Sequence, residues 1–294
     1  WARARGRPWI GHFPILLGKR ADCYYFPADQ HLAYGEQLRD HMMGAGVAAN
    51  TIEVVGSFTY DKHRTRDRKA DRLAVEKSFP RTRNVKLVTV ATENLPDCDI
   101  EMIPVLSAVC AMPGVHVVLK LHPEDSLDYF ERLAERLRVR DRIDIVKKYP
   151  LGELLGASDL LICIMSNIVI EAGVTGTPTL MCDFSGKARV LDFAAEGLCM
   201  PCKSASELPE ILGKLLSDES YMQMALQRMH AGLRRFNGPN DGRSTQRIVD
   251  YVVARAGLAC AVDTIASGQP STMSDGRSGA GESGASQDTV TMAR

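Results

Sequence analysis

A lysine and a histidine follow an apolar run in the stretch KLHPEDS, residues 120–126. The preceding letters, VHVVL, have the composition of a buried β-strand, so His122 would stand at its carboxyl end. Ligands of open parallel sheets bind outside the carboxyl ends of the strands. A histidine there could donate to a phosphate oxygen or pack against a nucleobase. The alternative is a histidine that only caps a loop.

The neighbours of His122 have a structural explanation. Pro123 suits the first position of a helix, where its missing N–H is not needed. Glu124 and Asp125 suit the first helical turn electrostatically. Lys120 has the same strand parity as His122 and could point the same way. The alternative is a lysine that is exposed or paired with a carboxylate.

A second candidate site is the stretch MSNIVIEAGVTGTP, residues 165–178. Ser166 is predicted to cap a helix that follows a buried strand, with Asn167 beside it at the helix start. The free N–H groups and positive dipole end of such a helix suit a phosphate. Glu171, inside the same helix, could accept hydrogen bonds from two ribose hydroxyls. The alternative is a plain capped helix with a surface glutamate.

A third pair of residues follows the next apolar segment. Lys187 and Arg189 lie in the loop DFSGKAR, where they could meet a diphosphate, with bidentate geometry available to the arginine. A solvated pair is the alternative. His122, Pro123, Ser166, Asn167, Glu171, Lys187 and Arg189 are therefore the predicted nucleotide-binding residues, with no metal ligand among them.

The elements that must position these residues alternate between strand and helix. Strands are predicted at 22–26, 51–56, 85–91, 115–121, 142–146, 159–165 and 178–182. Helices are predicted at 32–43, 61–84, 99–112, 124–138, 151–156, 167–175, 204–217, 219–236 and 244–257. This order predicts right-handed crossovers and a doubly wound, Rossmann-like parallel α/β sheet, with the remnant of a second α/β domain before it.

Composition changes along the chain suggest four parts. Residues 1–60 would end an amino-terminal α/β domain, and 61–84 would form a charged interdomain helix or linker. Residues 85–257 would be the nucleotide-binding domain. Residues 258–294 are a predicted disordered tail, because their Gly- and Ser-rich composition cannot bury enough apolar surface. The first residue is Trp1, not Met, so we expect part of the protein to lie upstream.

The charge balance and the cysteines exclude several classes of protein. Thirty-six Lys and Arg balance thirty-six Asp and Glu, which gives no reason to expect a nucleic-acid partner. We find no signal peptide and no apolar run that could span a membrane. Cys199 and Cys202 form a lone C-x-x-C without the second pair that a zinc site needs, so free buried thiols are predicted. No phosphate-binding P-loop, dinucleotide fingerprint or nucleophile elbow occurs.

These stretches together resemble the carboxyl-terminal half of a GT-B glycosyltransferase. The resemblance covers residues 20–236 and rests on segments 28–57, 117–125 and 157–181. Segment 117–125 resembles the His-Pro motif of sialyl-, polysialyl- and CDP-glycerol-type transferases. The resemblance implies that His122 and Ser166 face the donor phosphates, and that Glu171 faces the ribose or a nearby donor hydroxyl.

The chain also departs from GT-B patterns. Cys163 stands where many retaining enzymes carry the first glutamate of a spaced pair, which leaves the stereochemistry open. Residues 164–167 read Ile-Met-Ser-Asn, whereas non-hydrolysing 2-epimerases of this fold carry Asp-Ser-Gly-Gly. GT-B enzymes place the acceptor site and usually the general base in the amino-terminal domain, so we name no catalytic base.

The resemblance predicts a cytoplasmic transferase that needs no cofactor beyond its substrate. It would move a sugar, or a group such as glycerol phosphate, from a nucleotide-activated donor to a surface glycan or lipid-linked acceptor. A helix N-terminus and His122 would stabilise the leaving diphosphate. A peripheral location at the inner face of the membrane stays open. The alternatives are a sugar-nucleotide 2-epimerase and a nucleotide-binding fragment without activity.

Overall fold

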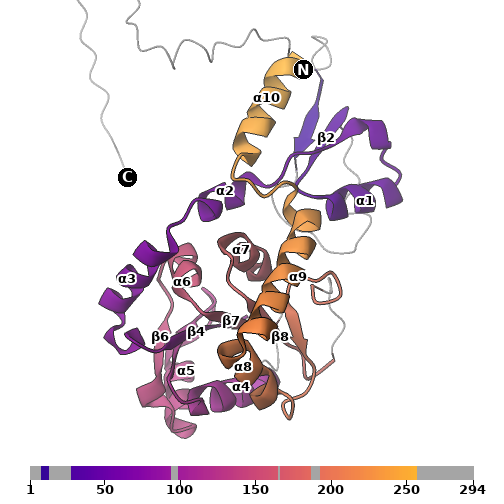
Figure 1. The fold of residues 1–294 in the computed structure, drawn as a ribbon. Helices are drawn as coiled ribbons and strands as arrows, with labels where there is room; N and C mark the ends of the chain where they lie inside the picture. The colour runs from indigo at the N-terminus through magenta and orange to yellow at the C-terminus, as the bar shows by residue number, and fades with distance from the viewer. Residues whose placement is uncertain (1–7, 13–27, 94–98, 165, 187–192, 257–294) are drawn as a thin grey trace, which may run out of the picture. The chain divides into compact units, whose positions relative to one another are not determined.

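The computed structural model describes residues 8–12, 28–93, 99–164, 166–186 and 193–256 (Figure 1). Two parallel sheets lie within them. The smaller has the order β1-β2-β3, and the larger has the order β6-β5-β4-β7-β8-β9. The strands are β1 (Ile10–His12), β2 (Gln30–Ala33), β3 (Ile52–Val54), β4 (Lys86–Ala91), β5 (Val115–Lys120), β6 (Ile143–Val146), β7 (Leu160–Cys163), β8 (Thr179–Cys182) and β9 (Met200–Cys202). The predicted doubly wound α/β fold is confirmed.

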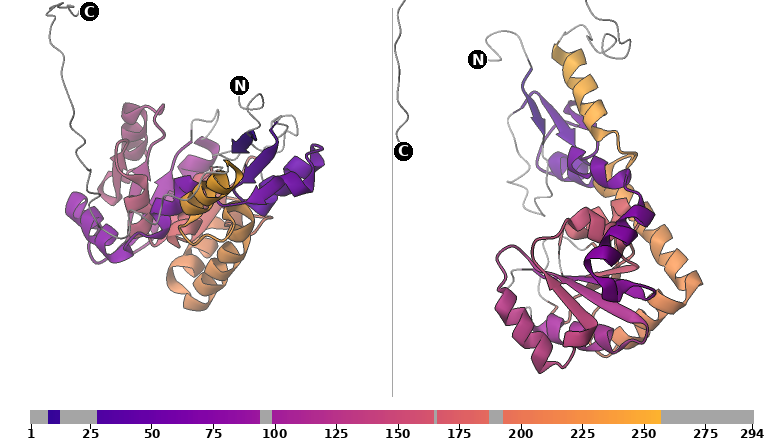
Figure 2. Two further views of the ribbon diagram at one scale, coloured as in Figure 1. Left: turned by 90° about the horizontal axis from the view of Figure 1, so that it is seen from above. Right: turned by 90° about the vertical axis from the view of Figure 1, so that its left-hand side faces the viewer.

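Helices connect the strands and cover both faces of the larger sheet (Figure 2). They are α1 (Glu36–Gly44), α2 (Phe58–Arg64), α3 (Arg68–Ser78), α4 (Asp99–Ala111), α5 (Leu127–Arg136), α6 (Leu151–Ala157), α7 (Ile168–Thr175), α8 (Leu208–Ser217), α9 (Glu219–Asn237) and α10 (Ser244–Ala256). Parallel pairing of β4 with β5 and β7 requires such crossovers.

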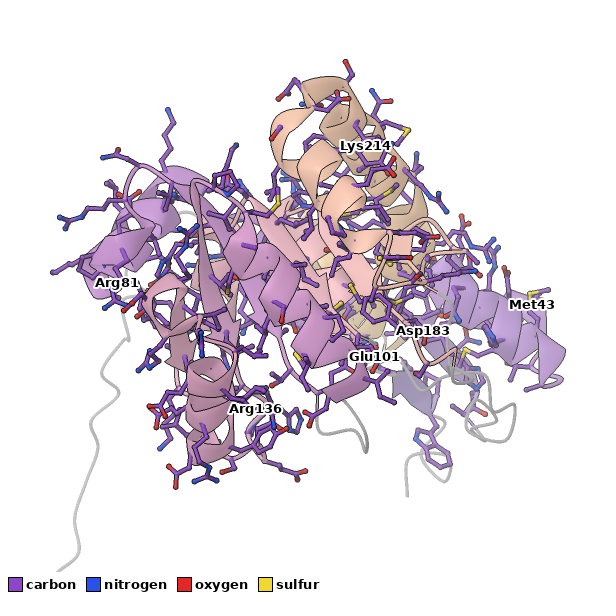
Figure 3. All side chains as sticks on the ribbon, turned by 90° about the horizontal axis from the view of Figure 1, so that it is seen from below. Met43, Arg81, Glu101, Arg136, Asp183 and Lys214 are labelled. Atoms are coloured by element: carbon purple, nitrogen blue, oxygen red, sulfur yellow. The ribbon has the colours of Figure 1, made fainter. Side chains whose placement is uncertain are left out.

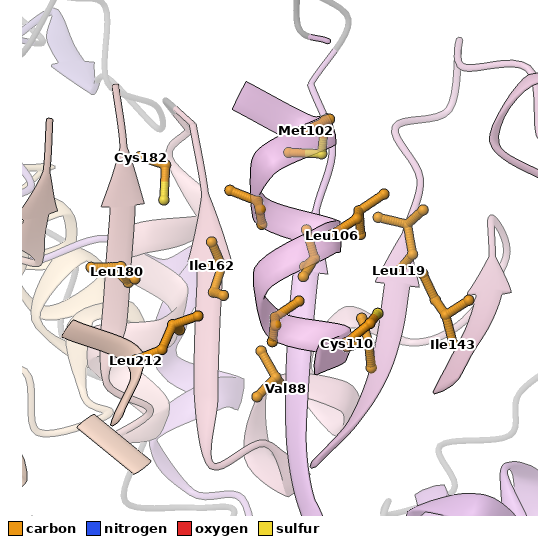
Figure 4. Close-up of a cluster of buried hydrophobic side chains, with 14 of the residues drawn as sticks. Val88, Met102, Leu106, Cys110, Leu119, Ile143, Ile162, Leu180, Cys182 and Leu212 are labelled. Carbon is orange, nitrogen blue, oxygen red and sulfur yellow. The ribbon is translucent and has the colours of Figure 1, made fainter. Parts of the chain in front are cut away.

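The central strands bury side chains on both faces, which explains their almost continuous apolar letters. On one face, Val88 and Ile162 pack in a cluster with Leu106 of α4, as Figure 4 shows. On the other face, Leu87 packs with Val75 of α3 and with α6. The alternation along β4 therefore fixes which helices lie on which side of the sheet.

Three elements differ from the sequence prediction. The helix predicted at 61–84 is divided into α2 and α3, because Asp67 caps a new helix that begins at Arg68 and ends at Ser78. Leu32 and Ala33 end strand β2 instead of opening a helix, and α1 begins only at Glu36. Strand β9 (Met200–Cys202) was not predicted, because proline at its centre argues against a central strand. β9 is the edge strand of its sheet, where a missing N–H is tolerated. The predicted strand at 22–26 lies outside the described residues.

The last described helix, α10, makes its hydrogen bonds to residues near the beginning of the chain. The Asp61 carboxylate of α2 accepts from the backbone N–H groups of Ser244 and Thr245, at 3.0 and 2.7 Å. The Tyr251 hydroxyl donates to the side chain of Gln30 in β2 at 2.6 Å. These contacts place α10 against α2 and β2. The division of the chain into four parts stays a prediction.

Candidate functional site

The order of the larger sheet defines a switch point at its carboxyl edge. β4 is central, with the chain proceeding through β5 and β6 to one side and through β7, β8 and β9 to the other. Doubly wound sheets bind ligands in the crevice outside the strands at such a point. Thr92 follows β4, His122 follows β5 and Ser166 follows β7. The last two are separated by one strand, which spaces their backbones by roughly 10 Å.

The backbone at His122 is held by two side chains. The His122 N–H lies 2.8 Å from the Thr92 hydroxyl and 3.1 Å from the Asp125 carboxylate. The Thr92 hydroxyl itself donates to the Asp125 carboxylate. The sequence predicted neither contact. Thr92 lies thirty residues before His122, and Asp125 was expected to support the first turn of the next helix. The three residues tie the ends of two neighbouring strands into one loop structure.

The imidazole of His122 has a defined orientation. Its Nδ1 atom accepts a hydrogen bond from the backbone N–H of Glu124 at 3.3 Å. A neutral imidazole that accepts at Nδ1 carries its proton on Nε2. The Nε2–H group is then the donor that remains for a ligand, and the side chain is half-buried at the carboxyl edge.

The helix after β5 begins later than the sequence predicted. Pro123 is not its first residue, because residues 123–125 form a turn and α5 begins at Leu127. Ser126 is the N-cap, and its hydroxyl accepts from the Tyr129 N–H at 3.3 Å. The Asp125 carboxylate bonds to the loop instead of supporting a first turn, which is how such side chains compete with helix formation.

Lys120 is tied to the backbone and not to a carboxylate. Its ammonium donates to the carbonyl oxygens of Leu121 and Lys147, at 3.1 and 2.9 Å. Burial lowers the pKa of this ammonium group. The Lys147 ammonium in turn donates to the Asp125 carbonyl at 2.8 Å. The two lysines brace the His122 loop against the segment that follows β6.

The start of α7 is close to the prediction but shifted by one residue. Asn167 and not Ser166 occupies the N-cap position, and its side chain makes no capping bond. The Ser166 hydroxyl accepts from the Ile168 N–H at 3.4 Å, and the Ser166 carbonyl accepts from Val169 at 3.2 Å. The hydroxyl and the first N–H groups of α7 are therefore together at the carboxyl edge.

Glu171 lies on the first turn of α7, where that helix packs against α2. Burial raises the pKa of its carboxyl group, and the charge of Lys62 on α2 opposes that rise. Burial and the Glu171 charge together push the pKa of Tyr60 above its ordinary range. The role of Glu171 as a ribose ligand stays a prediction.

The loop after β8 is described only in part. Lys187 and Arg189 lie outside the described residues, so their predicted phosphate contacts are untested. Within the described part, the Glu101 carboxylate of α4 accepts from the Ser185 N–H at 3.0 Å. Glu101 is 3% exposed, so this buried carboxylate fixes the loop close to the switch point. Figure 3 labels Glu101 on α4 and Asp183 directly after β8.

The predicted free thiols are confirmed where the structure describes them. Cys110, Cys163, Cys182, Cys199 and Cys202 are all buried and unbridged. Within the described ranges, no group of three His, Cys, Asp or Glu could hold a metal ion. The helices of these ranges also include none with the length and apolar character to cross a membrane.

Solved structures share this fold at low sequence identity. HepE of Anabaena, solved with UDP and glucose, matches with a TM-score of 0.54 and 16% identity over 86% of this chain and 73% of its own. A UDP-N-acetylglucosamine 2-epimerase matches at 0.61 and 17%, over 90% of this chain and 69% of its own. The wall teichoic acid polymerase TagF, solved with CDPG, matches at 0.56 and 15%, over 78% and 56%.

These similarities define the class. The chain has the Rossmann-like α/β fold of GT-B enzymes, and it spans little more than half the length of TagF. A search of curated protein sequences found no match. A sequence profile of the CDP-glycerol:poly(glycerophosphate) glycerophosphotransferase family matches residues 103–254, just over half of the 294-residue chain. The chain belongs to this family of nucleotide-donor transferases.

Proposed function

We propose that this protein binds a cytidine-diphosphate-activated donor at the carboxyl edge of the larger sheet and transfers glycerol phosphate to a glycan or lipid-linked acceptor. The acceptor hydroxyl would attack the phosphorus next to the glycerol. A new P–O bond forms, the bond between the two phosphates breaks, CMP leaves, and the hydroxyl proton passes to a base. The family membership supports a nucleotide donor, and the geometry supports where the phosphates would lie.

The observation on which the proposal depends most is the arrangement of His122. The bond from Glu124 N–H to Nδ1 leaves Nε2–H as a preset donor at the switch point. A preset donor costs little reorganisation when negative charge develops on a leaving group. The positive dipole end of α7, two strands away, would stabilise the same charge, while the N–H groups of Ile168 and Val169 bond to Ser166. The match to the His-Pro motif of related transferases is part of this proposal.

A sugar donor and the epimerase activity are the competing functions. HepE was solved with UDP and glucose and with UDP-glucose, whereas TagF was solved with CDPG, and both proteins share this fold. The family match favours the cytidine donor. An epimerase would consume its donor without an acceptor. A fragment without activity would bind nucleotide and convert nothing.

The test is the melting temperature of the chain with CMP, CDP, UDP, GDP and ADP. A ligand at about 100 times its dissociation constant adds roughly 2.7 kcal/mol to the free energy of unfolding. Stabilisation by CMP and CDP, lost in the variant His122→Ala, is the expected result. Stabilisation by UDP alone would replace the glycerol phosphate proposal by a sugar-nucleotide function. No stabilisation by any nucleotide would contradict a donor site in this chain.

A further inference from the structure

Four buried cysteines of the described chain lie at one side of the larger sheet. Cys163 ends β7, Cys182 ends β8, Cys202 ends β9, and Cys199 directly precedes β9. Each has at most 3% of its surface exposed, and no disulfide joins any two of them. The C-x-x-C pattern in the sequence points to Cys199 and Cys202 as the pair that could react. The structure points to a different pair.

The pleat of the sheet sends these cysteines to opposite faces, because side chains alternate along a strand. Cys182 and Cys202 belong to the apolar cluster that includes side chains of α4 and α8, and Figure 4 labels Cys182 and Leu180 on β8. Cys163 and Cys199 belong to the cluster on the other face, which includes side chains of α7 and α9. The backbone of the sheet therefore lies between Cys199 and Cys202 and holds their sulfur atoms apart.

Cys182 and Cys202 face each other across two neighbouring strands. β8 and β9 are parallel, and the two cysteines are partners in register. The Asp183 N–H donates to the Cys202 carbonyl at 3.0 Å, which fixes the end of that register. Neighbouring strands lie about 4.8 Å apart, within the roughly 4.4–6.8 Å that separates the Cα atoms of a disulfide. The two side chains therefore share one face at a separation that a disulfide can bridge.

The two thiols differ in reactivity. A hydrogen bond between them raises the pKa of Cys182 well above its ordinary value and lowers the pKa of Cys202. Cys202 therefore ionises first, and the thiolate is the reactive form of cysteine. Cys202 also ends a three-residue edge strand and is followed by the exposed Lys203. Such a strand end opens locally more readily than the centre of a sheet, which gives a small oxidant access.

We propose that Cys182 and Cys202 form a reversible disulfide when a peroxide oxidises the protein. The Cys202 thiolate attacks hydrogen peroxide, so that an S–O bond forms, the O–O bond breaks, and the hydroxide that leaves takes up the proton released by Cys202. The Cys182 sulfur then attacks the sulfenic sulfur of Cys202. The S–S bond forms, the S–O bond breaks, and the departing hydroxide takes the Cys182 proton. Two thiols lose two electrons, and one peroxide becomes two waters.

The disulfide would fasten the edge strand to the sheet. In the reduced protein, β9 can separate from β8 by local opening, which exposes the Asp183 N–H that bonds to Cys202. A covalent link beside that hydrogen bond prevents the separation. We expect amide exchange of Asp183 to be at least about tenfold slower in the oxidised protein than in the reduced one.

The experiment treats the reduced full chain with a small molar excess of hydrogen peroxide under native conditions. The remaining thiols are then alkylated, and the peptides are mapped by mass spectrometry without reduction. We expect a peptide pair that links Cys182 to Cys202 and that separates after treatment with dithiothreitol. A link from Cys202 to Cys199 or to any other cysteine, or no link in the folded chain, would overturn the proposal.

Three variants sharpen the test. Cys199→Ala should still form the link, whereas a C-x-x-C disulfide would be lost. Cys182→Ala removes the second thiol, so a sulfenic acid should persist at Cys202 and react with dimedone. The matched control Cys110→Ala removes a buried cysteine of the same core cluster and should still form the link. Absence of dimedone labelling at Cys202 in Cys182→Ala would contradict the proposed order of attack. No nucleotide is present, so the result is independent of the proposed function.

Discussion

The backbone nitrogen of Glu124 lies 3.3 Å from Nδ1 of His122 and donates a hydrogen bond to it. The residue two positions further along the chain than the histidine therefore determines which ring nitrogen keeps the proton. The backbone of the same loop is held by the hydrogen bonds from the His122 N–H to Thr92 and Asp125. The donor group at Nε2 is thus set before any ligand arrives, and this arrangement can be tested by comparing two substitutions.

The variants His122→Gln and His122→Asn should differ in nucleotide affinity. The glutamine side chain can place an amide N–H near the position of Nε2, whereas the shorter asparagine amide reaches only the position of Nδ1. We expect the asparagine variant to bind CDP at least tenfold more weakly than the glutamine variant, since one hydrogen bond to a charged group is worth about 1.5–3 kcal/mol. Titration calorimetry measures both. Equal affinities would show that Nε2–H does not contact the nucleotide.

Replacement of Asp125 by asparagine should weaken the loop. The carboxylate accepts from both the His122 N–H and the Thr92 hydroxyl, and a neutral amide oxygen is the weaker acceptor. We expect the free energy of unfolding in urea to fall by about 1–3 kcal/mol, with a parallel loss of nucleotide affinity. Asp128→Asn, on the exposed first turn of α5, is the matched control and should change neither quantity by more than about 0.5 kcal/mol. A loss as large in the control would remove the special role of Asp125.

The carboxyl group of Glu171 predicts a pH dependence of stability. Burial raises its pKa above the ordinary 4.5, so the folded protein binds this proton more tightly than the unfolded chain. The free energy of unfolding therefore falls as pH rises from the unfolded pKa through the folded one. Glu171→Gln should be more stable than the wild type above that window, and the gain should vanish as pH falls below about 4.5. Urea titrations across this range measure the difference.

The exposed carboxylate of Glu135 on α5 provides the control for that experiment. Glu135→Gln should show no such pH-dependent gain, because no buried carboxylate is removed. A Glu171→Gln variant whose stability stays parallel to the wild type from acid to neutral pH would refute the burial argument. Weaker CDP binding by the same variant would support its predicted contact with the ribose.

Two glycines should respond oppositely to alanine. A Cβ atom on Gly156 of α6 would overlap the Asp71 carboxylate of α3, which pairs with Arg66. Gly156→Ala should therefore destabilise the protein by about 2–4 kcal/mol. A Cβ on Gly213 of α8 meets nothing within 4 Å, and alanine there should stabilise the helix by about 0.5–1 kcal/mol. Thermal unfolding of both variants measures the contrast, and a neutral Gly156→Ala would show that α3 can shift on α6.

The large sheet was predictable because its strands are apolar on both faces and are separated by helices of regular period. Helical spacing of the apolar residues Leu127, Phe130, Ala134 and Leu137 predicted α5, and two of these four residues are buried. The start of that helix was not predictable. It depends on the bond between Asp125 and Thr92, which are 33 residues apart, and no local pattern reports such a contact.

The sequence predicted which residues of the candidate site follow the strands, but it did not predict the hydrogen bonds that these residues make. His122 and Ser166 lie at the carboxyl edge, as their position after apolar segments indicated. The sequence could not show that the Lys120 ammonium would donate to backbone carbonyl oxygens. Hydrophobic periodicity predicts which way a lysine points but not which acceptor it finds. Glu101 was missed because a buried glutamate in an apolar helix gives no signal until its partner, Ser185, is known.

The bond between Asp61 and the start of α10 also has a consequence for synthesis. Ser244 and Thr245, whose N–H groups donate to Asp61, emerge from the ribosome more than 180 residues after it. Gln30 and its hydrogen-bond donor Tyr251 are separated by 221 residues, which is a longer interval still. The three-stranded sheet thus acquires its last partners only when the larger sheet has already been translated. A nascent chain would expose that part throughout, and its final docking is the kind of long-range step that makes folding slow.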